Sequence, residues 1–285
     1  MPYKCPIIIL FAITLVSCGK QPKTEIQAPF NYTMEGSGDT TLIFIHGLAI
    51  NQTYWENQVD EFMDHYTVIT LDLPGHGASK LTTSPATVEG YANNIVEFVE
   101  LLDIQNVVLI GHSMAGNVEL LAYPQIKDNV IGVIGVDNFQ ELGEPFSEEG
   151  RKKIDSVMIV LKAHYKANVM KLFGELFSPL TDDLTRKRVT EGFVNGDSIM
   201  VTQLLTSIID NSQYERSQMK KLEVPLILIE SDMFPIDRSA LKENCLAGYK
   251  IFTIDSTGHY PMIERPEEFN ESLRAALRFI KSQKK

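Results

Sequence analysis

A serine and a histidine stand in two short glycine-containing segments, and together they could perform nucleophilic catalysis. Ser113 lies in the segment Gly-His-Ser-Met-Ala-Gly, residues 111–116, and His259 lies in Thr-Gly-His-Tyr-Pro, residues 257–261. A serine hydroxyl is a weak nucleophile unless a base removes its proton. An imidazole, with an unperturbed pKa of about 6.5, can take that proton and return it to a leaving group. The two segments therefore predict acyl transfer, in which Ser113 attacks a carbonyl.

The elements on either side of Ser113 explain how its hydroxyl could be exposed. The chain passes from a predicted strand at 106–110 to a predicted helix at 114–123, with the serine on the tight turn between them. Such a turn holds its serine in a strained backbone conformation at the end of a sheet. The N-terminus of the helix offers N–H groups and positive partial charge where an oxyanion would form.

The elements that must position these residues alternate along the chain from residue 41 onward. The apolar runs are rich in Val, Ile and Leu, which is typical of strands covered on both faces in a parallel sheet. We predict strands at 41–48, 66–73, 106–110, 130–136, 224–229 and 249–254, and helices at 54–64, 87–102, 114–123 and 266–282. The alternation indicates an α/β fold with a doubly wound, mostly parallel sheet, in which ligands bind beyond the carboxyl ends of the strands.

Residues 139–221 interrupt this alternation, because their pattern is helical and contains no convincing strand. A connection of this length is too long for ordinary crossover helices. We therefore predict a helical cap at 139–221, inserted into a core formed by 31–138 and 222–285. Four cap residues are candidates for lining a pocket between the strand ends and the cap, with packing as the alternative role: Met158, Phe173, Phe177 and Met200. Tyr54 and Trp55 could border the mouth of this pocket or pack their own helix.

The segments around Ser113 and His259 resemble the nucleophile elbow and the histidine loop of the α/β-hydrolase fold superfamily. The resemblance extends over residues 41–282, and the departure at the elbow is mild, with Ala115 where the motif has a second glycine. It implies that Ser113 is the nucleophile, that His259 is the general base, and that the backbone N–H groups of Leu48 and Met114 form the oxyanion hole. His46, which ends the first core strand, is expected to be structural.

Three aspartates are candidates for the acid that orients His259. In most of the family it follows the strand predicted here at 224–229, but the usual position holds Phe234, with Asp232 two residues before it and Asp237 three residues after it. A minority of the family takes the acid from the end of the preceding strand. That position is Asp137 in this chain, and we favour it over Asp232 and Asp237.

A serine at the elbow implies hydrolysis of a carboxylic ester or a related acyl substrate through an acyl-enzyme. No metal and no cofactor is expected, and no Cys/His cluster has zinc-ligand spacing. The same scaffold carries two alternatives. One is carbon–carbon bond hydrolysis or perhydrolysis, and the other is a ligand-sensing receptor with little turnover.

The composition excludes several other classes of protein. The 285 residues carry 26 basic and 37 acidic side chains, for a net charge of −11, and 44% are hydrophobic. The hydrophobic content excludes a disordered chain, and the negative charge argues against nucleic acid, which is bound through basic surfaces. The partner that the resemblance implies is a small acyl substrate.

The start of the chain has the layout of a secretory leader, with Lys4, an apolar run at 6–16 and small residues after it. The sequence Leu-Val-Ser-Cys-Gly at 15–19 resembles the lipobox of bacterial lipoproteins. It implies a signal peptide at 1–17, lipidation of Cys18 and a tether at 18–30. The expected location is the periplasmic or cell-surface face of a membrane. Cys245 then stands alone, so no disulfide is expected.

Overall fold

The computed structural model describes residues 28–81, 84–140, 142–143 and 146–283. Within these residues the centre is a seven-stranded sheet with the order β1-β3-β2-β4-β5-β6-β7. β1 pairs antiparallel with β3, and the other neighbours are parallel. The strands are β1 (Asn31–Glu35), β2 (Thr41–Ile45), β3 (Thr67–Asp72), β4 (Val107–His112), β5 (Val130–Val136), β6 (Leu226–Ser231) and β7 (Tyr249–Ile254).

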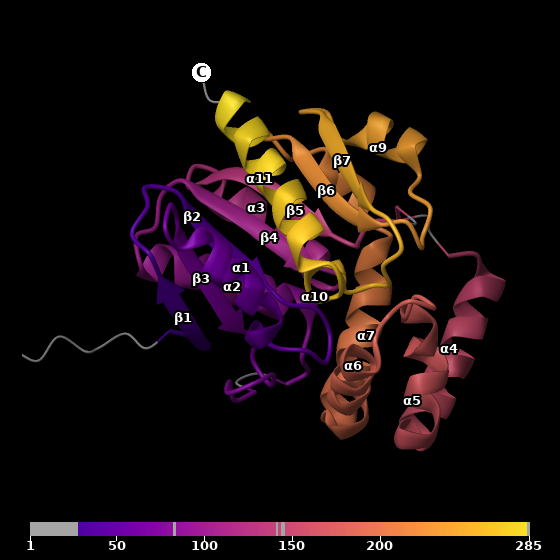
Figure 1. Ribbon diagram of the computed structural model, residues 1–285. Coiled ribbons are helices and arrows are strands. Elements are labelled where there is room, and N and C mark those ends of the chain that lie inside the picture. The colour runs from indigo at the N-terminus through magenta and orange to yellow at the C-terminus, as the bar shows by residue number, and fades with distance from the viewer. Residues whose placement is uncertain (1–27, 82–83, 141, 144–145, 284–285) are drawn as a thin grey trace, which may run out of the picture.

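Helices cover both faces of this sheet (Figure 1). α1 and α11 pack on one face, and α2 and α3 pack together on the other. The core helices are η1 (Gln52–Trp55), α1 (Glu56–Phe62), α2 (Val88–Leu101), α3 (Ala115–Ile126), α9 (Arg238–Asn244), α10 (Pro261–Glu264) and α11 (Pro266–Gln283). The predicted fold class, a doubly wound and mostly parallel α/β sheet, is confirmed.

The central strands are apolar because they are covered on both sides. Every residue of β2, β4 and β6 is buried. The edge strand β1 is mostly exposed and was not among the predicted strands. The first core strand ends at Ile45 rather than at 48, so the chain leaves the sheet at His46 and forms a loop there. This earlier exit places Leu48 in a loop that borders the cavity described below.

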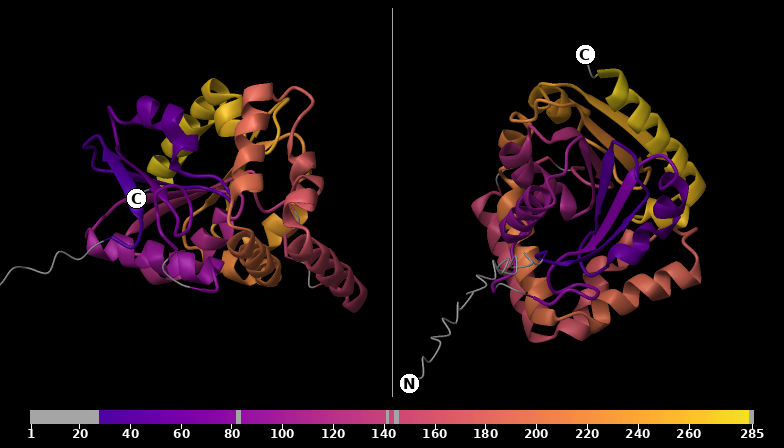
Figure 2. Two further views of the ribbon diagram at one scale, coloured as in Figure 1. Left: turned by 90° about the horizontal axis from the view of Figure 1, so that it is seen from below. Right: turned by 90° about the vertical axis from the view of Figure 1, so that its left-hand side faces the viewer.

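Between β5 and β6 the described chain is helical and contains no strand. Its elements are α4 (Glu148–Ala163), α5 (Tyr165–Phe173), η2 (Gly174–Leu176), α6 (Asp183–Asn195), α7 (Ser198–Ser212) and α8 (Glu215–Met219). Three of these helices begin at side-chain caps, in which Ser147, Asp182 and Asp197 accept hydrogen bonds from backbone N–H groups. Figures 1 and 2 show these helices gathered on one side of the sheet, away from β1.

The predictions for the signal peptide at 1–17 and for Cys18 lie outside the described residues. Among the helices that the structure describes, none is long and apolar enough to cross a membrane. Cys245 is a buried free cysteine whose sulfur lies 3.8 Å from the sulfur of Met219.

Candidate active site

Ser113 occupies a strained turn between β4 and α3. Its φ angle is 54°, in the left-handed region that side-chain-bearing residues seldom adopt. Its backbone N–H donates to the Val136 carbonyl at 2.9 Å, which ties the turn to the end of β5. The turn also needs a glycine at 111, because a Cβ there would lie 2.5 Å from the carboxyl carbon of Glu119.

His259 lies between a hydroxyl and a carboxylate. Its Nε2 is 2.8 Å from the Ser113 Oγ, and its Nδ1 is 2.5 Å from the Asp137 Oδ2. With Nδ1 donating to the carboxylate, the neutral ring has an acceptor at Nε2, which faces the serine hydroxyl. The histidine is 9% exposed and the aspartate 1%, so the hydrogen bond between them is shielded from water, whereas the serine hydroxyl borders the cavity. The structure thus brings Ser113, His259 and Asp137 together.

Asp137 follows β5 directly and has a φ angle of 47°. Its second oxygen, Oδ1, accepts hydrogen bonds from the backbone N–H of Ser231 at 2.9 Å and from its hydroxyl at 2.7 Å. Burial alone would raise the pKa of this carboxyl group. The hydrogen bond and charge of His259, together with the two bonds from Ser231, outweigh burial and lower the pKa below its ordinary value. Asp137 is therefore an ionised partner for the imidazole.

The other two aspartates are used elsewhere. Asp232 accepts a hydrogen bond from the backbone N–H of Ser256 at 2.9 Å, at the start of the loop that carries His259. Asp237 caps α9 by accepting from the N–H groups of Ser239 and Ala240, although it also borders the cavity. Neither forms a hydrogen bond with His259 in the described part of the chain.

The histidine loop is fixed by a glutamate that the sequence analysis did not single out. Glu264 accepts hydrogen bonds from the backbone N–H of Gly258 at 2.9 Å and of Tyr260 at 3.2 Å, on both sides of the histidine. It also accepts from the Thr181 hydroxyl at 2.6 Å, which connects the loop to the cap. The only available signal was its place five residues after His259.

A second histidine, His112, also binds the backbone of this loop. His112 Nε2 donates to the His259 carbonyl at 2.7 Å. Burial, reinforced by the nearby His259, lowers the pKa of His112 to about 3, so its ring stays neutral. His112 is thus a neutral donor that fixes the backbone of the histidine loop.

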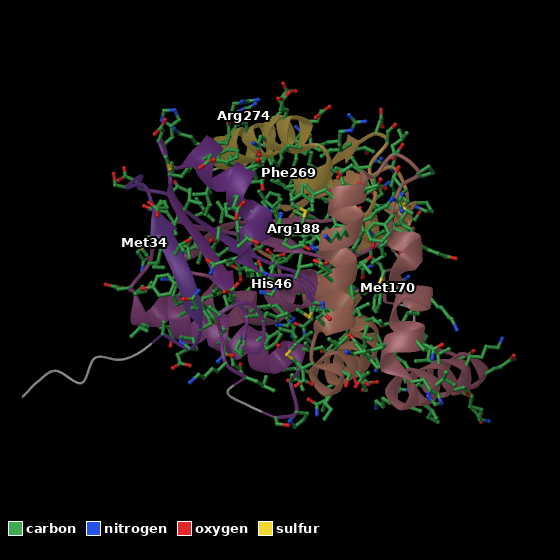
Figure 3. All side chains as sticks on the ribbon, turned by 60° about the horizontal axis from the view of Figure 1, so that its bottom comes forward. Met34, His46, Met170, Arg188, Phe269 and Arg274 are labelled. Atoms are coloured by element: carbon green, nitrogen blue, oxygen red, sulfur yellow. The ribbon has the colours of Figure 1, made fainter. Side chains whose placement is uncertain are left out.

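The loop after β2 brings Leu48 beside the serine turn, and both Leu48 and Met114 border the cavity. His46 fixes this loop: its Nδ1 donates to the Gly47 carbonyl at 2.7 Å, and its Nε2 accepts from the Leu73 N–H at 3.0 Å. The Gly47 carbonyl belongs to the same planar peptide as the Leu48 N–H and points the opposite way. Holding the carbonyl therefore sets the direction of the Leu48 N–H. Figure 3 labels His46 near the centre of the molecule.

The histidine at 46 is structural, as expected, because burial lowers its pKa to about 4 and both ring nitrogens bind backbone groups. The following loop is held in a similar way. Asp72 accepts hydrogen bonds from the backbone N–H groups of Gln52 and Ala78, each at 2.9 Å. His76 Nε2 accepts from the Ala49 N–H at 3.3 Å.

A cavity of about 1040 Å³ opens above Ser113, between the strand ends and the cap. Of the candidate lining residues, Phe173 borders it, whereas Met158, Phe177 and Met200 do not. The two aromatic residues of η1 are packing residues: Trp55 contacts Phe44 and Phe269, and Tyr54 lies under the Arg188 guanidinium at 4.2 Å. Arg188 belongs to α6, so this contact joins cap and core.

No group of three or more His, Cys, Asp or Glu side chains within the described residues could hold a metal ion. The arrangement of hydroxyl, imidazole and carboxylate can instead generate a serine nucleophile, beside a cavity large enough for a small organic substrate.

Comparisons with known proteins agree with this architecture. The 3-oxoadipate enol-lactonase 2 of Acinetobacter baylyi is 21% identical over 277 residues, covering 91% of this chain and 97% of the relative. The karrikin insensitive 2 receptor CA of Petunia hybrida is 23% identical over 262 residues, covering 85% and 93%. The solved structure of a hydrolase from Oleispira antarctica superposes with a TM-score of 0.76 at 20% identity, covering 90% and 96%.

A family model extends over most of the chain. The model described as "Alpha/beta hydrolase family" matches residues 42–272, which include β2, the serine turn, the cap and the histidine loop. The protein therefore belongs to the alpha/beta hydrolase family.

Proposed function

We propose that this protein is a serine hydrolase that cleaves a carboxylic ester or a related acyl substrate through an acyl-enzyme on Ser113. The observation that carries the proposal is the unbroken chain of hydrogen bonds from the Ser113 Oγ through His259 to Asp137. Aligned in this order, the three groups have the geometry that activates a serine for attack on a carbonyl.

The first half of the reaction follows from this geometry. His259 Nε2 takes the hydroxyl proton as the Ser113 Oγ bonds to the substrate carbonyl carbon. The carbonyl oxygen becomes an oxyanion, which accepts hydrogen bonds from the backbone N–H groups of Leu48 and Met114. Asp137 stabilises the imidazolium that has formed. The intermediate then collapses, the ester C–O bond breaks, and His259 gives its proton to the departing alcohol.

The second half repeats these steps with water. His259, neutral again, takes a proton from a water molecule that attacks the acyl carbon. A second tetrahedral intermediate forms in the same oxyanion hole and releases the carboxylic acid, while the proton returns to Ser113. No metal and no cofactor takes part in either half.

The choice of an ester over the other reactions of this scaffold has support from one relative. The similar protein from Acinetobacter baylyi is an enol-lactonase, and a lactone is a cyclic ester. Carbon–carbon hydrolysis and perhydrolysis use the same serine, so a panel of substrates separates them. A p-nitrophenyl butanoate assay, a vinylogous diketone and a peracid assay would rank the three activities.

The test of the nucleophile is covalent labelling combined with turnover. We expect a fluorophosphonate to label the wild type at Ser113, as located by mass spectrometry. The Ser113→Ala variant should lose labelling and lose p-nitrophenyl butanoate hydrolysis by about 10³-fold or more. An exposed serine at 156 offers a matched control, and Ser156→Ala should behave as the wild type. Label on another residue, or full activity in Ser113→Ala, would refute the proposal.

A ligand-sensing role is the second candidate function, and the similarity to a Petunia hybrida receptor favours keeping it. Kinetics distinguish the two. A hydrolase turns over an ester steadily after the first acylation, whereas a sensor of this kind releases one equivalent of product and then stays acylated. Steady turnover over many equivalents would exclude the sensor.

A further inference from the structure

One wall of the cavity carries a buried carboxylate that the catalytic steps do not use. Glu215 stands at the start of α8, is 7% exposed, and borders the same cavity as Ser113 and His259. Carboxylates are seldom buried without a partner of opposite charge, because removing the ion from water costs several kcal/mol. Glu215 therefore needs an explanation that the rest of the fold does not give.

The partners of this carboxylate are neutral. Asn117 Nδ2 donates to Glu215 Oε1 at 3.0 Å, and the backbone N–H of Gly143 donates as well. In the described part of the chain no lysine or arginine forms a salt bridge with it. The neighbouring Arg216 also borders the cavity, where its Nε donates to the Leu142 carbonyl at 2.8 Å. Two donors leave part of a carboxylate's acceptor capacity unused.

Without a cationic partner among the described residues, Glu215 has a raised pKa. Burial raises the pKa of Glu215 to about 7, although the hydrogen bonds from Asn117 and Gly143 oppose this shift. A glutamine at this position could accept a hydrogen bond from the same Asn117 amide without the free-energy cost of burying a charge. The two hydrogen bonds alone therefore do not explain why the residue is charged. The cavity is the remaining place from which a counter-ion could come.

The position of the pair relative to the nucleophile fits a small substrate. Asn117 is the third residue of α3, and the Gly116 N–H donates to the Ser113 carbonyl at 3.0 Å, so about one turn of chain, on the order of 5–6 Å, separates Asn117 from the nucleophile. Leu205 and Ile208 of α7 border the same cavity and supply apolar walls. A chain of about four bonds starting at the bound carbonyl spans such a distance.

We propose that Glu215 and Asn117 form a subsite for a cationic ammonium group of the substrate, located about four bonds from the ester carbonyl. Glu215 supplies the negative charge, Asn117 fixes the orientation of its carboxylate, and the bound cation replaces the missing counter-ion. This inference rests on the proposed ester hydrolysis and makes it more specific, because it names the chemistry of the preferred substrate.

Isosteric ester pairs test the subsite. One pair varies the acyl group, as the p-nitrophenyl esters of 4-(trimethylammonio)butanoate and 5,5-dimethylhexanoate. The other varies the alcohol, as the butanoates of choline and of 3,3-dimethylbutanol. In at least one pair we expect the wild type to prefer the cation by about tenfold or more in kcat/KM, mainly through KM. Glu215→Gln should remove that preference and leave the neutral ester within about threefold.

A matched variant controls for the change in net charge. Glu175 lies in the cap, is exposed and does not border the cavity. Glu175→Gln removes the same charge and should keep the full preference for the cationic ester. The proposal is overturned when the wild type prefers the neutral ester in both pairs, or when Glu215→Gln retains the preference for the cation.

A binding measurement separates this proposal from the proposed function. Butyltrimethylammonium should raise the thermal unfolding temperature of the wild type and not that of Glu215→Gln, because it binds only the folded subsite. Equal shifts in both proteins overturn the subsite. A wild type that shows this selective shift but neither hydrolyses esters nor reacts with a fluorophosphonate would support the subsite and refute the ester hydrolase.

Discussion

At the scale of single residues, the site depends on which carboxylate meets the imidazole. Asp137 and Asp232 follow neighbouring strands, so the sequence left them open, together with Asp237, although it favoured Asp137. The structure separates them by their partners: Asp137 binds His259 and Ser231, whereas Asp232 binds the backbone of Ser256. A buried carboxylate with the histidine as its partner also has the lowered pKa that an orienting acid needs.

This difference predicts unequal effects of two conservative substitutions. Asp137→Asn should lower kcat by about 10³–10⁴-fold, because the amide no longer holds His259 in the tautomer that accepts the serine proton. Asp232→Asn keeps an oxygen that can accept from Ser256 and should stay within a few-fold of the wild type. Steady-state kinetics with p-nitrophenyl butanoate measures both. Equal losses, or a larger loss in Asp232→Asn, would contradict the assignment of the acid.

At the scale of elements, the loops are positioned by hydrogen bonds that connect the core with the cap. Glu264 holds the histidine loop and binds Thr181 of the cap. His259 itself donates its backbone N–H to the Leu176 carbonyl at 2.8 Å. The cap therefore does more than cover the cavity, because it also contributes to the position of His259.

Because Glu264 holds the histidine loop, removing its carboxylate should lower both kcat and stability. Glu264→Ala leaves the N–H groups of Gly258 and Tyr260 without their acceptor. It should lower kcat by about tenfold or more and destabilise the fold by about 1–3 kcal/mol. Glu264→Gln, which keeps one acceptor oxygen, should recover part of the activity. Thermal unfolding and kinetics measure both effects.

The exposed Glu267, in the first turn of the adjoining helix α11, provides the matched control, and Glu267→Ala should leave kcat unchanged and lower stability by no more than about 1 kcal/mol, the contribution of a first-turn charge. Unchanged kcat in Glu264→Ala would show that the histidine keeps its position without this glutamate.

The elements that could be predicted from the sequence are those with a strong local signal. The apolar runs of β2 to β7 and the long amphipathic helix α11 have such signals, and the structure contains them close to the expected bounds. β1 lacks one, because an exposed edge strand is paired on one side only and needs no apolar run. α9 and α10 are too short for periodicity to reveal.

The side chains of the site divide in the same way. Ser113 and His259 stand in motifs that local sequence reveals, whereas Ser231, Glu264 and Glu215 act through partners distant in the chain or through backbone groups. Glu215 meets Asn117 across 98 positions, a pairing that only the packing of α8 on α3 creates. No local pattern marks such a residue, and that is why the sequence analysis missed it.

At the scale of the whole molecule, the chain enters the fold at the edge strand β1. Figure 3 shows the labelled Met34 of β1 and Met170 of α5 on opposite sides. We propose that Cys18 is lipidated and attaches the protein to a membrane from this edge, which leaves the cap and the cavity accessible. A stretch of eleven residues, 19–29, reaches at most about 35–40 Å.

Membrane attachment through Cys18 predicts a change in fractionation. The wild type expressed in a bacterium should pellet with membranes, and Cys18→Ala should appear in the soluble exported fraction with the same rate of p-nitrophenyl butanoate hydrolysis as the wild type. Cys245→Ala is the matched control, since Cys245 is buried in the core. Continued pelleting of Cys18→Ala would count against lipidation.

The stability of the whole molecule should depend on pH through Glu215. Its pKa is raised by burial from 4.5 to about 7 in the folded protein, so between these values the folded state retains a proton that the unfolded state has lost. Stability therefore falls as pH rises through this window, by on the order of 3 kcal/mol at most. The groups that donate hydrogen bonds to the carboxylate, Asn117 and the backbone of Gly143, do not titrate.

Glu215→Gln isolates this effect, because it removes the titrating group and leaves the other carboxylates unchanged. We expect the variant and the wild type to have similar free energies of unfolding at pH 5. As the pH rises to 8, the variant should become increasingly more stable than the wild type. Urea unfolding at both pH values measures the difference in the free energy of unfolding, with Glu175→Gln as the control. The prediction is wrong when the gap between variant and wild type is the same at pH 5 and pH 8, since the carboxylate would then titrate alike in both states. The same measurement also tests the cation subsite. If the difference in the free energy of unfolding grows with pH, and butyltrimethylammonium added to the wild type removes it, then the cation offsets the destabilisation caused by the buried charge.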